Sequence, residues 1–194
     1  MKKQVKINIP ESWAEVTLEQ YQNYVISTDT KDEAAVMFNT IASLCSVPRE
    51  YVERFKIEDL KKVYTNLNKL IEKPLNKELV NIIEIDGVRY GMHPNLDSMS
   101  FGEYVDLEEF AKAGLIGFHK VLAILYRPIA DEQGARYNIE PYEVEHQRNA
   151  EKFKGVNMDV INGVSVFFYT LGGKFLQIFQ ASTGAEIMTE TAAK

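Results

Sequence analysis

The sequence predicts a predominantly helical α+β fold, with about six to seven helices and one small antiparallel sheet. Two observations lead to this prediction. Apolar residues recur with the helical period through most of the chain, most clearly over residues 57–71. Alternation of apolar and polar residues is clear only at Val5 to Ile9 and at residues 82–92, so we expect an N-terminal strand and a β-hairpin to share the sheet.

The turn of the predicted hairpin is Asp86-Gly87. It separates two short apolar runs, 82–85 and 88–90. A two-residue Asp-Gly loop favours the positive φ angles that match the twist of a tight hairpin. Residues 82–92 therefore form the strongest β signal in the chain.

Helices before the hairpin are predicted from their start signals. Thr17 and Gln20 form a capping box, and Asp32 can cap a second helix. Pro48 suits the first turn of a short helix that reaches Phe55. The expected helices are 18–27, 32–46, 48–55 and 57–71.

Helices after the hairpin are predicted in the same way. Ser100 and Glu103 form a second capping box, Gly114 is a stop signal, and Pro128 ends the next apolar helix. Residues 129–140, with mixed charge and Gly134, are typical of an exposed loop. The expected helices are 100–113, 115–126, a weakly helical 143–153, and a strongly apolar 158–181.

The 194 residues are enough to bury a core without disulfides or metals. We expect a single α+β domain over residues 1–181. Residues 182–194 are small and polar, and we expect them to form a flexible tail or an arm that contacts another subunit.

The formal charge of −6 argues against general nucleic-acid binding, which needs clustered Lys and Arg. The lone Cys45 fits a reducing compartment. Residues 160–173 form the longest apolar stretch and are too short to span a membrane, and the first ten residues do not predict a secretory signal. We therefore expect neither a membrane protein nor a secreted one.

No group of residues identifies a reaction. His93, His119 and His146 lack the spacing of a helical zinc site, so no metal is predicted. The acids of residues 97–109 are interpreted as a solvated or partner-binding face. Phosphate-binding loops and nucleophile elbows are missing from the sequence. We therefore expect no enzyme activity, no catalytic residues and no cofactor.

Four segments resemble small proteins encoded among the virion and assembly genes of tailed bacteriophages, including crAss-like phages. The resemblance covers most of residues 5–180. The segments are Ile9-Pro10-Glu11-Ser12-Trp13 with Val16 to Tyr21, Gly91 to Asp97, Phe101 to Leu107, and His119 to Pro128.

This resemblance implies a non-enzymatic structural protein of the virion, a ring or connector component of the portal-tail region. Its partners would be copies of itself in a ring and other portal or tail proteins, and DNA would pass a lumen without sequence-specific binding. An excess of aromatic residues favours interfaces, and the predicted interface residues are Tyr126, Arg127, Tyr137 and Tyr142. The alternative is a tail assembly chaperone that is absent from the mature particle, and a host-directed regulator or enzyme is a third class.

Overall fold

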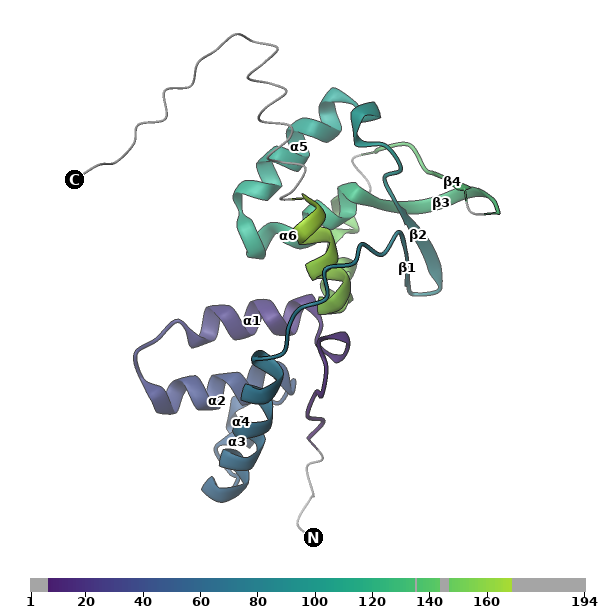
Figure 1. Ribbon diagram of the computed structural model, residues 1–194. Helices are drawn as coiled ribbons and strands as arrows, with labels where there is room; N and C mark the ends of the chain where they lie inside the picture. The colour runs from purple at the N-terminus through teal and green to yellow at the C-terminus, as the bar shows by residue number, and fades with distance from the viewer. Residues whose placement is uncertain (1–6, 135, 144–146, 169–194) are drawn as a thin grey trace, which may run out of the picture.

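The computed structural model describes residues 7–134, 136–143 and 147–168. It has the predicted α+β architecture, mainly helical with a small antiparallel sheet. Four helices form one layer near the N-terminus, and the sheet lies with the remaining helices beside it (Figure 1). The helices are α1 (Leu18–Thr28), α2 (Glu33–Leu44), α3 (Arg49–Val52), α4 (Ile57–Ile71), α5 (Phe101–Lys112), α6 (Gly114–Leu125) and a helix at 158–168, with short 3-10 helices η1 (Trp13–Glu15), η2 (Leu96–Ser98) and η3 (Ala150–Gly155).

The first helical layer follows the local signals closely. The Thr17 side chain accepts a hydrogen bond from the Gln20 amide while the Gln20 side chain accepts one from the Thr17 amide, which confirms the capping box. Asp32 caps α2 by accepting from the amides of Ala34 and Ala35. The layer packs around fully buried apolar side chains: Leu18, Ile41, Leu44, Val52 and Leu67.

The predicted hairpin is confirmed as β1 (Ile82–Ile85) and β2 (Val88–Met92). Asp86 and Gly87 have φ angles of 53° and 77°, as a turn of this type requires. The expected N-terminal strand is wrong for its described part, because residues 7–10 are not in a strand, and the rest of it lies outside the described residues. The hairpin instead pairs with β3 (Tyr126–Gln133), so the sheet order is β1-β2-β3-β4.

The chain passes from α6 into β3 without an intervening residue, since α6 ends at Leu125 and β3 begins at Tyr126. Gly114 starts α6 with a φ of 58°, which explains why α5 stops before it. Pro128 cannot continue a helix and lies in β3 opposite Tyr90. The apolar helix α6 is thus joined rigidly to the sheet.

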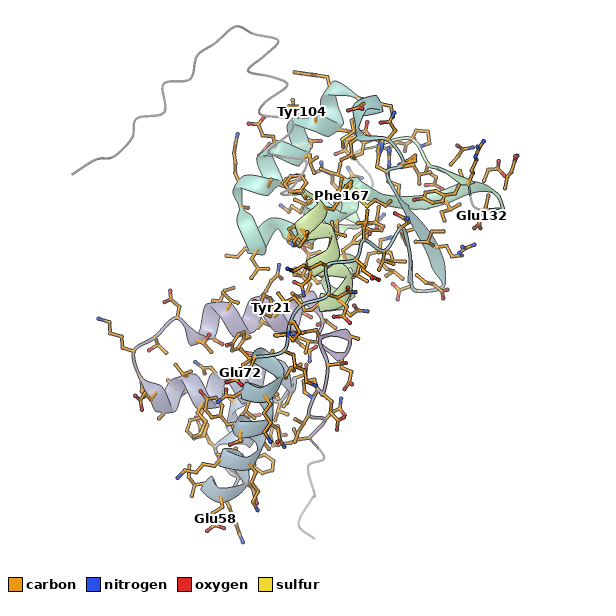
Figure 2. All side chains as sticks on the ribbon, in the orientation of Figure 1. Tyr21, Glu58, Glu72, Tyr104, Glu132 and Phe167 are labelled. Carbon is orange, nitrogen blue, oxygen red and sulfur yellow. The ribbon has the colours of Figure 1, made fainter. Side chains whose placement is uncertain are left out.

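Residues 129–140, predicted to be a loop, contain instead a second hairpin made of the outer part of β3 and β4 (Arg136–Ile139). We call residues 129–134 and 136–139 the hairpin arm. It projects away from the helices, and Figure 2 shows Glu132 far out along it. Its side chains are mostly exposed. The outer part of β3 is exposed and does not alternate, and the alternation of β4, in which Tyr137 and Ile139 are half-buried, spans only four residues, so the sequence resembles a loop.

Two contacts tie the hairpin arm to β2. Arg89 of β2 forms a bidentate ion pair with Glu132 of β3. The Tyr137 ring of β4 lies against Gly91 of β2, and its hydroxyl donates to the Met92 carbonyl oxygen at 2.8 Å. A Cβ at position 91 would fall within the space that the Tyr137 ring occupies.

We expect Gly91→Ala to loosen the hairpin arm. The added Cβ would lie 2.6 Å from Tyr137 Cδ2, so the ring must move off β2. Overpacking of this kind costs about 1–3 kcal/mol of unfolding free energy. The measurement is the urea denaturation midpoint together with hydrogen exchange of the β4 amides, which should become faster. If Tyr137→Ala is already present, Gly91→Ala should cost little, and an equal cost in both backgrounds would contradict the contact.

The last predicted helix begins at residue 158, as expected, and is described to residue 168. Gly163 of this helix packs directly on the backbone of Glu78 and Leu79, in the segment that leads to β1. Residues 169–181 and the predicted tail 182–194 lie outside the described residues, and the domain boundary at 181 stays a prediction.

Candidate functional site

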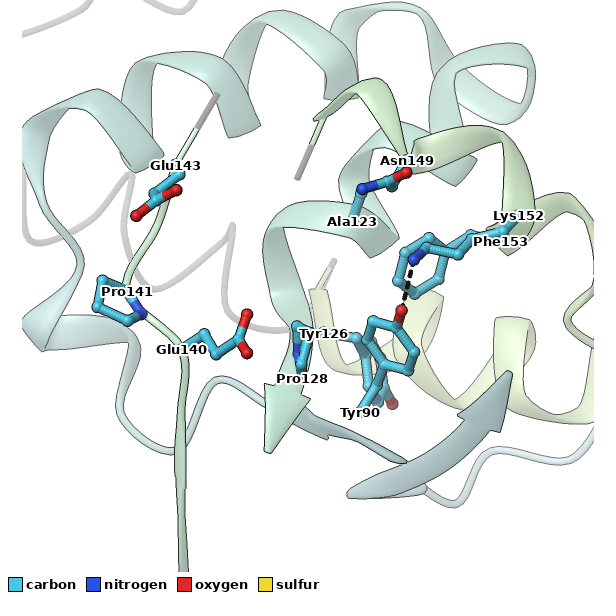
Figure 3. Close-up of a pocket in the computed structure, with 10 residues that line it drawn as sticks. All are labelled: Tyr90, Ala123, Tyr126, Pro128, Glu140, Pro141, Glu143, Asn149, Lys152 and Phe153. Atoms are coloured by element: carbon cyan, nitrogen blue, oxygen red, sulfur yellow. Dashed lines mark hydrogen bonds between the residues drawn. The ribbon is translucent and has the colours of Figure 1, made fainter. Parts of the chain in front are cut away.

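The candidate site is a cavity of about 270 Å³ beside the start of β3 (Figure 3). It forms where the end of α6, the 3-10 helix η3, strand β2 and the segment after β4 meet. We call it the aromatic pocket. Its lining residues are Tyr90, Ala123, Tyr126, Pro128, Glu140, Pro141, Glu143, Asn149, Lys152 and Phe153.

Aromatic rings form the floor of the pocket. Tyr90, Tyr126 and Phe153 are all buried, and the rings of Tyr90 and Phe153 meet edge to face with centroids 5.4 Å apart. The Tyr126 hydroxyl donates to the Val80 carbonyl oxygen, which fixes the ring beneath the cavity. Burial raises the pKa of Tyr126. The floor is therefore apolar and rigid.

Charged side chains form the rim. Lys152 donates a hydrogen bond to the Tyr90 hydroxyl and lies over the Tyr90 ring, with Nζ 4.9 Å from the ring centroid. Glu140 and Glu143 lie on the opposite side, and Figure 3 shows the Glu140 carboxylate directed toward the space above Tyr126 and Pro128. An apolar floor with a few polar groups at the mouth is the usual composition of a binding site.

A buried ion pair lies nearby, where β3 meets the start of α5. Arg127 Nη1 is 2.9 Å from Glu103 Oε1, and both side chains are almost fully buried. Glu103 also accepts from the Ser100 amide at 2.6 Å, as the second half of the confirmed capping box. Burial alone would raise the pKa of Glu103, but the hydrogen bonds with Ser100 and the charge of Arg127 outweigh it and hold the pKa below its usual range.

His93 is the third member of this cluster. Its Nε2 lies 3.8 Å from Glu103 Oε1, and its backbone amide donates to the Leu125 carbonyl oxygen at the end of α6. Burial lowers the pKa of His93, and the charge of Arg127 lowers it further, against the opposing effect of Glu103. These contacts place His93 between the end of α6 and the start of α5.

His119 on α6 is also buried, with Nε2 3.2 Å from Glu151 Oε1. Burial lowers its pKa, although the Glu151 carboxylate opposes this effect. Burial raises the pKa of the Cys45 thiol to about 11, so this cysteine is protonated at neutral pH and acts as a small apolar residue.

The four residues predicted at an interface have partners inside the chain. Tyr126 is 1% exposed and Arg127 is 4% exposed, so neither lies on the surface, because α6 continues into a central strand and carries both into the core. Tyr142 donates to Asp106 Oδ2 at 2.6 Å. Tyr137 and Tyr142 are half-buried, and their interface role stays a prediction.

Sequence reasoning missed the aromatic pocket. Its residues come from four separate segments of the chain, and no local spacing connects them. The one local signal is the excess of aromatic residues, ten Tyr and ten Phe, which does not say where in the fold these rings meet. Tyr126 is the only predicted interface residue that lines the pocket as described.

Among the described residues, no three His, Cys, Asp or Glu side chains gather as metal ligands. In the same part of the chain, every helix is too short or too polar to cross a membrane. Comparisons with family models, curated proteins and solved structures gave no match to this chain.

We expect the stability to fall as the pH drops below about 6.5, the ordinary pKa of histidine in an unfolded chain. Burial lowers the folded-state pKa of His93 and His119, so the unfolded chain takes up protons first and acid favours unfolding. The contribution of the two histidines to the free energy of unfolding is complete above about pH 6.5. It is lost as the pH falls from there through the folded-state pKa values. Urea midpoints measured from about pH 7.5 to about pH 5 test it.

The control is the double variant His93→Gln/His119→Gln. Its midpoint should change less over the same pH range, because neither position then titrates. The low pKa of Glu103 acts in a separate window at more acidic pH. An equally steep loss in the variant and the natural chain would show that the histidines are not responsible.

Proposed function

We propose that this chain is a non-enzymatic structural protein of a tailed bacteriophage virion, a ring or connector subunit of the portal-tail region. Its partners are copies of itself and other portal or tail proteins. The resemblance described above is the starting point of this proposal, and the shape of the subunit supports it.

The hairpin arm is the observation that carries the proposal. An isolated two-stranded hairpin is marginal in water, and this one projects from the body with mostly exposed side chains. Arg89 pairs with Glu132, and Tyr137 donates to the Met92 carbonyl oxygen, so two contacts tie the arm to β2. An arm with little packing inside its own subunit is suited to contact a neighbouring one.

Large apolar side chains are exposed on several helices as well. Phe101 on α5, Ile116 on α6, Ile26 on α1 and Ile57 on α4 are each more than half exposed. They lie on different elements, which is compatible with more than one contact surface. Head-to-tail rings need two different surfaces on each subunit.

The electrostatic character is compatible with this role. A net charge of −6 disfavours tight binding to phosphates, so DNA could pass a ring lumen without adhering. The net charge supports the proposal only in combination with the hairpin arm and the exposed apolar residues.

The test is mass spectrometry of purified virions, combined with hydrogen exchange of the chain in the particle. We expect a stoichiometric subunit in which residues 129–139 exchange slowly in the particle and quickly in the isolated chain. The amides of α6, which are buried in both states, provide the internal control. Absence of the chain from the mature particle would reject the ring proposal and identify the tail assembly chaperone.

A further inference from the structure

We propose that residues 174–181, near the C-terminal end of this chain, dock on an exposed apolar face of α5 in the same copy. The inference goes beyond the proposed function and does not depend on it. It joins a helix face that the structure leaves exposed with an apolar segment of the sequence that lies outside the described residues.

Helix α5 has apolar residues on two neighbouring faces. One face carries Leu107, which is buried in the core. The other face, which we call the α5 face, carries Phe101, Tyr104 and Val105 at positions i, i+3 and i+4 of the helix. These three side chains are 83%, 41% and 41% exposed. A surface helix usually has one apolar stripe directed at the core, so a second stripe indicates a surface that another segment covers.

Residues 174–181 have the sequence of an amphipathic helix. Four large apolar residues fall on one side of a helical projection, and the polar residues fall on the other. The apolar side consists of Phe175, Leu176, Ile178 and Phe179, and the polar side of Lys174, Gln177 and Gln180. An element with one apolar side is stable only when that side is buried against another element. The segment therefore requires an apolar surface of about the kind that α5 presents.

The connection to the described part of the chain is short enough for this contact. Phe168, the last described residue, is packed half-buried against the core. Figure 2 shows its neighbour Phe167 in the same half of the molecule as Tyr104 of α5. The six residues that follow Phe168 span up to about 20 Å when extended. Among them, Gly172-Gly173 favours a change in chain direction, which would turn the segment toward the α5 face.

The short connection also favours docking within one copy. A segment that is tethered close to its site has an effective concentration on the order of millimolar. The same segment of a second copy would have to compete against this local concentration. The covalent link therefore selects the chain's own C-terminal segment as the occupant.

The charges beside the two surfaces are complementary. Lys174 is the only charged residue between positions 169 and 181. Glu109 lies one turn after Val105 at the margin of the α5 face, is exposed, and has no ion-pair partner within the described part of the chain. A pair between the two would be weak at the surface, but it favours one orientation of the docked segment.

The experiment uses the full chain with two added cysteines and a short bismaleimide cross-linker. Val105→Cys labels the α5 face, and Leu176→Cys labels the segment while Phe175 and Phe179 remain in place. The single natural cysteine, Cys45, is buried and its thiol pKa is raised to about 11, so it reacts slowly with the reagent.

The matched control is the pair Ile26→Cys/Leu176→Cys. Ile26 is also an apolar residue on a helix and is 57% exposed, but it lies on α1 in the first helical layer. Melting temperatures of all variants check that the fold is retained. If Val105→Cys lowers the melting temperature, Glu108→Cys, which is exposed at the margin of the α5 face, replaces it.

We expect the Val105→Cys/Leu176→Cys pair to cross-link within one copy, giving a product of monomeric mass, at least about 10-fold faster than the control pair. Adding Phe179→Ser removes a central ring of the segment, and adding Phe101→Ser removes the most exposed ring of the α5 face. Each addition should reduce the rate toward that of the control.

Equal cross-linking rates in the test and control pairs would overturn the inference. A main product that contains two chains would also overturn it and would assign the segment to a neighbouring copy. Unchanged rates after Phe101→Ser and Phe179→Ser would show that the two labelled sites meet without the apolar contact, which likewise contradicts it. None of these outcomes bears on the proposed function, which is tested by the composition of the virion.

Discussion

Replacement of Arg127 by Met is expected to lower the free energy of unfolding by about 3–5 kcal/mol. The Glu103 carboxylate would remain buried without its cation, while Ser100 would still hold it in place. An unpaired buried charge costs far more than the net value of the pair itself. Urea denaturation at neutral pH, followed by circular dichroism, measures the change.

Two controls separate this effect from the loss of a side chain. Arg49 pairs with Glu53 at 3.2 Å on α3, but both side chains are more than half exposed, so Arg49→Met should cost less than about 1 kcal/mol. In the double variant Glu103→Gln/Arg127→Met the carboxylate is gone, and the loss should be smaller than the sum of the two single losses. Strict additivity would mean that the two groups do not interact.

Replacement of Gly163 by Ala is the second variant with a large expected effect. The added Cβ would lie 2.8 Å from the Glu78 carbonyl carbon and closer still to its oxygen. Because the obstacle is backbone, the helix at 158–168 and the segment before β1 must move apart. We expect a loss of about 3 kcal/mol, the upper end of ordinary overpacking.

Helix propensity alone would make Gly163→Ala more stable, since Ala is a better helix former than Gly by about 1 kcal/mol. A loss of unfolding free energy therefore reports the clash with the backbone. Gly102→Ala on α5 is the matched control: nothing lies within 4 Å of its added Cβ, so that variant should be neutral or slightly more stable. A stabilised Gly163→Ala protein in thermal and urea denaturation would show that the helix does not pack on Glu78 as described.

The parts of the fold that sequence predicts well depend on neighbouring residues. The capping boxes at Thr17 and Ser100, the stop at Gly114 and the turn at Asp86-Gly87 are each set by two to four adjacent positions. Their physics is local, so one sequence is enough to find them.

The parts that sequence misses depend on distant contacts. The outer part of β3 has no buried face to impose alternation, and the alternation of β4 spans only four residues, so the two strands look like a loop. Arg127 and Glu103 come from different elements, and nothing in their spacing shows that they pair. Tyr126 and Arg127 were predicted at an interface because interfaces draw on Tyr and Arg side chains, whereas the central strand β3 carries both into the core. The aromatic pocket was missed because its lining residues come from four separate segments of the chain.

The direct passage from α6 into β3 has a mechanical consequence. A loop between two elements would stretch under load, but here Leu125 and Tyr126 join a buried helix to the strand that forms half of the hairpin arm. A pull on the arm is therefore transmitted to α6, and separating the two requires breaking core contacts. In single-molecule stretching, force applied at the arm should unfold the core in one step, without a preceding low-force extension.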